Sequence, residues 1–257
     1  DAQLALGNCY RRGLGVEADG EQAVYWWNEA AEQGVEEAQL NLYSCGSCCF
    51  DLLFNGSAER LRKDAENGDV EAQCKLADAY GLGDGVEQNY ERAAYWYRKA
   101  AEQGDAGAAF ALGFCYYHGN GVERDRELAA DWARKAAELG DHQAAYTLGC
   151  CYQYGDGVEQ DYELASAWLH KAAELGNVEA MHAIADCYYL GEGVEQDYKA
   201  AAEWNRKAAE LGLDRAQLNI GELYRDGEGV EQNYEEAAKL FRKAAEQFFS
   251  PAQTALG

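Results

Sequence analysis

The stretch AAYTLGCCYQYGDGVEQD, residues 144–161, contains a Gly-x-Gly-Val-Glu phrase that occurs six times in the chain. The six copies begin at Gly13, Gly83, Gly119, Gly155, Gly191 and Gly227. From the second copy onward, successive copies are 36 residues apart. A period of this length is typical of a stacked array of small repeats, because one repeat alone cannot bury its apolar face. The spacing therefore predicts a repeat protein whose function depends on the surfaces of the stack.

Each repeat shows the pattern of two helices joined by a tight turn. Ala144, Leu148 and Cys151 fall on one stripe of a first helix. The two glycines that follow permit a tight turn with backbone angles closed to other residues. Asp161 is then placed to cap a second helix, which ends at the left-handed position expected for Gly176.

The second helices share an Ala-x-x-Trp-x-x-x-Ala pattern. Small alanine side chains let two helices approach closely, and we expect the tryptophans to fill the space left between them. The tryptophans at this position are Trp26, Trp96, Trp132, Trp168 and Trp204.

The combined motif resembles the Sel1-like repeat family, relatives of the tetratricopeptide repeats. It reads Ala-x-x-x-Leu-Gly-x-x-Tyr-x-x-Gly-x-Gly-Val-x-x-Asp, followed by Ala-x-x-Trp-x-x-Lys-Ala-Ala-Glu-x-Gly. The resemblance covers nearly the whole chain. It implies an all-α fold, a right-handed superhelical solenoid of about seven helix-turn-helix repeats, used as a protein-binding scaffold. It implies no shared reaction.

We expect residues 1–257 to form a single array. The second repeat is degenerate, because it lacks the Gly-x-Gly-Val turn and the tryptophan. The chain also begins and ends within the repeat pattern, so we expect it to be a stretch of a longer array. The repeats span approximately residues 2–37, 38–71 (degenerate), 72–107, 108–143, 144–179, 180–215, 216–251 and 252–257 (partial).

The chain is strongly acidic, with a formal net charge of −24. Such a field repels phosphate groups, and the basic stripe that nucleic-acid binding requires is missing, so nucleic acid and anionic membranes are poor partners. The longest apolar run falls short of the roughly 20 residues of a membrane span. The carboxylates either attract a basic protein partner or only keep a long array soluble, and the sequence leaves both explanations open.

Five of the nine cysteines occupy one equivalent place on the buried stripe of the first helix. Equivalent helices in adjacent repeats lie about a helix diameter apart, beyond the roughly 7 Å between Cα atoms that a disulfide spans. We therefore expect unpaired core thiols, which favour a cytoplasmic setting. The five are Cys9, Cys45, Cys115, Cys151 and Cys187.

The degenerate repeat contains the cluster Cys45-x-x-Cys48-Cys49, whose spacing suits metal ligands. A structural zinc site requires four ligands, and no histidine or second Cys-x-x-Cys lies nearby in the sequence. Cys9 or Cys74 from a neighbouring repeat would have to complete it. We favour a degenerate turn with incidental thiols and no cofactor, and keep a thiol- or metal-dependent protein as the alternative.

One catalytic arrangement is compatible with the pattern. His182 and Asp186 lie one turn apart on the same side of their helix, and Cys150 occupies the matching row in the preceding repeat. A thiol, an imidazole and a carboxylate would then converge. No oxyanion donor is evident, however, so we expect three residues of a binding surface and no enzyme.

The face of the first helices opposite the buried stripe varies between repeats and gathers aromatic residues in the middle of the chain. The resemblance implies that this face lines a concave groove. Exposed aromatics there are usual anchors of recognition, while packing against the adjacent helix is the other explanation. We expect a non-catalytic scaffold that binds a protein or peptide in this groove, or alternatively a structural segment of a larger multidomain protein. The predicted groove residues are Phe110, Phe114, Tyr117, Tyr146, Cys150, Tyr154, His182, Asp186 and Tyr189.

Overall fold

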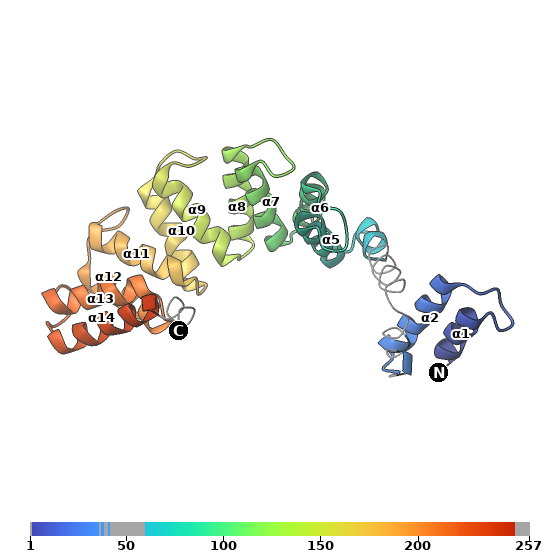
Figure 1. Cartoon of the computed structure of the whole chain (residues 1–257). Helices are drawn as coiled ribbons and strands as arrows, with labels where there is room; N and C mark the ends of the chain where they lie inside the picture. The colour runs from blue at the N-terminus through green and yellow to red at the C-terminus, as the bar shows by residue number, and fades with distance from the viewer. Residues whose placement is uncertain (1, 36, 39–40, 42–59, 250–257) are drawn as a thin grey trace. The chain divides into compact units, whose positions relative to one another are not determined.

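The computed structural model describes residues 2–35, 37–38, 41 and 60–249 (Figure 1). Within these ranges all regular secondary structure is helical and no strand occurs. The prediction of an all-α fold is therefore confirmed. The predicted turn of the degenerate repeat lies outside the described residues.

Contacts divide the chain into two compact units, residues 1–96 and 97–257. The first unit contains α1 (Ala2–Arg12), α2 (Gly20–Glu32), α5 (Val70–Leu82) and the beginning of α6 (Tyr90–Glu102). The second contains the end of α6 and then α7 (Ala106–His118), α8 (Arg126–Glu138), α9 (His142–Tyr154), α10 (Tyr162–Glu174), α11 (Val178–Leu190), α12 (Tyr198–Glu210), α13 (Asp214–Asp226) and α14 (Tyr234–Phe249). From α7 to α14, each helix packs against the next one along the chain, as a helix-turn-helix array requires. The single array and the handedness of its superhelix stay predictions.

The second helices begin and end where the sequence predicts. The Asp161 carboxylate accepts a hydrogen bond from the Leu164 amide at 2.9 Å, and Asp125 and Asp197 cap their helices in the same way. Gly176, just past α10, has a φ of 94°. This is the left-handed conformation that glycine adopts without strain.

The first helices have caps of their own, which the sequence analysis did not identify. The Asp141 carboxylate accepts a hydrogen bond from the Ala144 amide at 2.7 Å. Asp105 and Asn177 cap α7 and α11 in the same manner. These helices therefore begin before the alanine that opens each predicted repeat. A Gly-Asp or Gly-Asn pair stands just before each of these three helices, and it was the available signal.

The tryptophans of the second helices, which are predicted to fill the space between helices, are all half-buried. Trp168 is half-buried, with the Lys171 ammonium 4.7 Å from its ring centroid. The next residue, Leu169, is fully buried. It faces Gly149 of the first helix so closely that a Cβ atom there would lie 2.7 Å from Leu169 Cγ. Successive side chains of a helix point about 100° apart around its axis. The residue after the tryptophan therefore faces the first helix directly.

In three later repeats, the second glycine of the turn lies against the main chain of the preceding repeat. A Cβ atom at Gly193 would overlap the carbonyl group of Tyr162, the first residue of α10. Gly157 approaches the first residue of α8, and Gly229 that of α12, in the same way. These glycines are therefore required by the contact between repeats as well as by the turn.

Gly193→Ala should destabilise the protein more than Gly176→Ala. Both glycines have positive φ, so both substitutions carry about 1–2 kcal/mol of backbone strain. Only Gly193 also meets a neighbouring carbonyl group, since nothing lies within 4 Å of a Cβ at Gly176. We expect a further loss of about 1–3 kcal/mol in the free energy of unfolding, measured by urea titration. Equal losses in the two variants would show that the repeats do not approach each other at this glycine.

Candidate functional site

The predicted groove residues fall into two classes of exposure. Phe114, Tyr154 and Tyr189 are exposed, with Phe114 at 54% and Tyr154 at 74%. The others are half-buried: Phe110, Tyr117, Tyr146, Cys150, His182 and Asp186. The aromatic side chains of this face therefore differ in how much surface they offer to a partner.

Three of the predicted groove residues line one cavity. It has a volume of about 320 Å³ and lies between α7, α8 and α9, which follow one another in Figure 1. Phe110, Phe114 and Tyr117 contribute to its wall. The Phe114 ring packs against the ring of His118, with 4.1 Å between the centroids. The cavity is thus open beside the exposed Phe114 side chain and extends inward to α8.

The cavity exists because two facing positions lack large side chains. Ala133 follows the tryptophan of α8, at the position that Leu169 occupies in α10 and Phe241 in α14. Those larger side chains press against the glycine of their own first helix. Opposite Ala133 stands Gly113, so neither helix fills the space beneath Phe114. The sequence analysis missed this cavity, although the exchange of a large side chain for Ala133 was its signal.

Tyr117 also connects two successive repeats. Its hydroxyl donates a hydrogen bond to Asp156 Oδ2 at 3.1 Å, and the Arg126 guanidinium donates to Oδ1 at 2.6 Å. The Arg126 guanidinium carbon lies 5.3 Å from the Tyr117 ring centroid. Tyr189 repeats the arrangement: its hydroxyl is hydrogen-bonded to Glu228, which raises the pKa of Tyr189. These tyrosines therefore hold the next turn in place as well as lying on the predicted groove.

His182 and Asp186 come together as predicted, with 3.6 Å between Nε2 of the histidine and Oδ2 of the aspartate. His182 Nδ1 lies 3.2 Å from the Asn205 side-chain oxygen, and Asp186 accepts a hydrogen bond from the Asn219 amide at 3.1 Å. Burial raises the pKa of Asp186, and the neighbouring His182 opposes that shift. These side chains join three helices into one polar network.

Cys150 belongs to a different contact. Its sulfur is hydrogen-bonded to the Tyr146 hydroxyl, and burial together with Cys150 raises the pKa of Tyr146 to about 12. Burial also raises the pKa of the Cys150 thiol itself. A raised thiol pKa is the opposite of what a nucleophilic cysteine requires.

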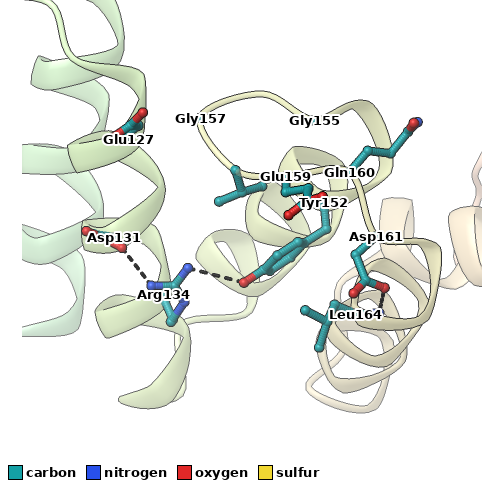
Figure 2. Close-up of a pocket in the computed structure, with 11 residues that line it drawn as sticks. Glu127, Asp131, Arg134, Tyr152, Gly155, Gly157, Glu159, Gln160, Asp161 and Leu164 are labelled. Carbon is teal, nitrogen blue, oxygen red and sulfur yellow. Dashed lines mark hydrogen bonds and ion pairs between the residues drawn. The ribbon is translucent and has the colours of Figure 1, made fainter.

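A second cavity, of about 850 Å³, lies beside the turn between α9 and α10 (Figure 2). Arg134 projects into it and donates hydrogen bonds to Asp131 at 2.6 Å and to the Tyr152 hydroxyl at 3.2 Å. The pairing of arginine with a tyrosine 18 residues later recurs along the chain, in Arg98–Tyr116 at 2.5 Å and Arg206–Tyr224 at 3.4 Å. The recurrence identifies a structural tie between repeats, which the sequence analysis missed.

Six cysteines fall within the described residues, and Cys9, Cys115, Cys150, Cys151 and Cys187 form no disulfide. Cys115 and Cys187 are buried, while Cys9 and Cys151 are half-buried, in agreement with unpaired thiols on the packed side of the first helices. Among the described residues, no three His, Cys, Asp or Glu side chains are grouped to hold a metal ion. The predicted cluster Cys45, Cys48 and Cys49 lies outside the described residues. No described helix has the length and apolar character of a membrane span.

A family model for the Sel1 repeat matches six segments of the chain: residues 1–35, 70–105, 106–141, 142–177, 178–213 and 214–247. The chain belongs to the Sel1 repeat family. Repeats of this family generally mediate protein–protein interactions, and their fold is typically non-catalytic. The residues between the first two matches coincide with most of the degenerate repeat predicted from the sequence.

Solved structures of Sel1 repeat proteins resemble this chain. A Sel1 repeat protein from Oxalobacter formigenes is 32% identical with a TM-score of 0.69, over 99% of this chain and 75% of that one. The c5321 protein, a protective antigen of uropathogenic Escherichia coli strains, is 35% identical with a TM-score of 0.68, over 96% of this chain and 45% of that one. The present chain thus spans less than half the length of the Escherichia coli antigen. No curated protein sequence matches it significantly.

Two thiols on the packed side of the first helices predict a loss of stability at alkaline pH. Burial raises the pKa of Cys151 and of Cys187 from 9.0 to about 11, so the folded protein keeps protons that the unfolded chain releases. The resulting stability is present in full below about pH 9 and declines as the pH rises toward 11, by on the order of 1 kcal/mol for each thiol.

Urea unfolding at about pH 8 and about pH 10.5 should show a smaller alkaline loss in the Cys151→Ala/Cys187→Ala variant than in the wild type. Alanine is a fitting replacement because Ala79 stands at the equivalent position of another repeat. The same alkaline loss in both proteins would contradict the raised thiol pKa values.

Proposed function

We propose that this protein is a non-catalytic scaffold that binds a protein or peptide on the exposed face of α7, α9 and α11. Membership of a family whose repeats mediate protein–protein interactions supports this proposal. The nearby polar clusters join one repeat to the next and provide no activated nucleophile. The binding face is the helix surface that carries the predicted groove residues.

The observation that carries the proposal is the position of Phe114. Its side chain is more than half exposed and stands at the edge of a cavity of about 320 Å³. A large aromatic side chain exposed beside a preformed cavity is the arrangement in which interface anchors are usually found. Burying that ring against a partner removes apolar surface from water, which stabilises the complex.

The acidity of the chain favours a partner with basic residues. A net charge of −24 raises the association rate with a positively charged partner and makes that rate depend on salt. A second candidate role, a structural segment of a larger protein, is supported by the Escherichia coli antigen, of which this chain spans less than half. In that case the same face would be covered by other parts of the longer chain.

Phe114→Ala should weaken binding of the natural partner with little effect on the fold. Loss of an interface anchor costs about 1–3 kcal/mol of binding free energy, or roughly tenfold or more in affinity. An exposed side chain contributes little to folding, so the melting temperature should change by no more than a few degrees. The partner is first isolated with the wild-type protein and identified, and its affinity for each purified variant is then measured by calorimetry.

Tyr234→Ala is the matched control, because Tyr234 is an equally large exposed aromatic at the first position of α14. Its affinity for the partner should equal that of the wild type. Unchanged binding by Phe114→Ala would contradict the proposed function. So would an early melting transition of that variant, since it would show that Phe114 is part of the core.

A further inference from the structure

We propose that the cavity between α7, α8 and α9 receives one aromatic side chain from a partner segment that carries basic residues beside it. This inference rests on the proposed function and names the chemistry of the partner. It follows from the shape of the cavity, from the state of the polar groups around it and from the charges farther along the same face.

The cavity is large enough for one large side chain. The room beneath Phe114 includes the space of a side chain that α8 lacks, because Ala133 stands where α10 has Leu169 and α14 has Phe241. A volume of about 320 Å³ lies at the lower end of the range of ligand-binding cavities. Gly113 and three alanines of α8 form the floor, so the occupant would meet methyl groups and main chain there.

Five of the polar side chains that line the cavity already have hydrogen-bond partners, and His118 and Cys151 line it as well. Tyr117 and Arg126 both donate to Asp156. Gln143 accepts a hydrogen bond from the Asn177 amide, and the Thr147 hydroxyl donates to the Gln143 carbonyl oxygen. A polar group placed in the cavity would lose its hydrogen bonds to water without gaining these side chains as new partners. An apolar group makes no such hydrogen bonds, so the pairing of the lining costs it nothing.

The lining favours an aromatic occupant over an aliphatic one. The rings of Phe110, Phe114, Tyr117 and His118 all face the cavity. Aromatic pairs in edge-to-face or offset arrangements contribute stability beyond the apolar area they bury. An aromatic side chain would therefore gain ring contacts that a leucine of similar volume cannot make.

The charges on the same face favour basic residues next to the aromatic one. Phe114 belongs to a row with a 36-residue period that continues through Cys150 on α9 to Asp186 on α11 and Glu222 on α13. The Glu222 side chain is exposed. A segment that leaves the cavity toward α11 and α13 thus meets the exposed Glu222 carboxylate and the half-buried Asp186, which already contacts His182 and Asn219, within a chain of net charge −24. Opposite charge on the segment steers its approach and stabilises the complex.

The first experiment uses single side-chain probes and ¹³C-labelled alanine methyl groups observed by NMR. N-acetylphenylalaninamide should shift the methyl signals of Ala129, Ala130 and Ala133, and N-acetyllysinamide should leave them unchanged. Ala133→Leu places in α8 the side chain that α10 already carries, so the variant should fold and the shifts of Ala129 and Ala130 should disappear. Ala133→Val, a smaller change, should at least halve them and serves if the leucine variant does not fold. Shifts of equal size in either filled variant, or none in the wild type, would overturn the inference.

The second experiment compares labelled peptides by fluorescence anisotropy. Acetyl-Lys-Lys-Phe-Lys-Lys-amide should bind the wild type about tenfold or more tightly than acetyl-Lys-Lys-Ala-Lys-Lys-amide, and Ala133→Leu should remove that difference. Equal binding of these two peptides would overturn the aromatic part of the inference. Acetyl-Glu-Glu-Phe-Glu-Glu-amide should bind more weakly than the lysine peptide with phenylalanine, and equal binding would overturn the basic part.

The two proposals fail in different ways. If capture of the natural partner depends on Phe114 but not on filling the cavity at Ala133, the cavity inference is wrong and the scaffold function stands. If the probes bind in the cavity but Phe114→Ala leaves capture of the natural partner unchanged, the scaffold function on this face is wrong.

Discussion

The structure depends on one close contact between successive repeats, that of the second turn glycine against the start of the preceding second helix. The contact recurs at Gly157, Gly193 and Gly229. A side chain at these positions is excluded both by a positive φ and by the neighbouring main chain. Because the contact fixes the turn, it also places the residue between the two glycines, and that residue then connects one repeat to the next.

The residues beside this contact explain why part of the aromatic face serves the fold. Asp156 lies between the two turn glycines and accepts hydrogen bonds from Tyr117 and Arg126 of the preceding repeat. Glu228 holds the equivalent place for Tyr189. These two tyrosines lie on the predicted groove and also tie repeats together. They are therefore less free to bind a partner than their exposure alone suggests. Phe114 has no hydrogen-bonding group, and its exposed ring is free of such a tie.

The regular features of the fold could be predicted from the sequence, because each is a local property that the period repeats. The turn glycines and the second-helix caps such as Asp161 are of this kind, although the first-helix caps such as Asp141, which are also local, were missed. Several features that depend on two helices at once were missed. The Arg134–Tyr152 tie, for example, joins residues of different repeats. Of the candidate site, the aromatic face was predicted, but the cavity was not, because its existence depends on Gly113 and Ala133 facing each other.

The proposed binding surface thus results from a local departure from the repeat, in which α8 lacks the large side chain that packs between helices in α10 and α14. Apolar cavities of this kind take up xenon, whereas polar sites hold ordered water. The most direct measurement is an X-ray structure of crystals pressurised with xenon. This account predicts a xenon atom bounded by Phe110, Gly113 and Ala133. A cavity that holds hydrogen-bonded water there, or that is filled by the Phe114 side chain turned inward, would contradict it.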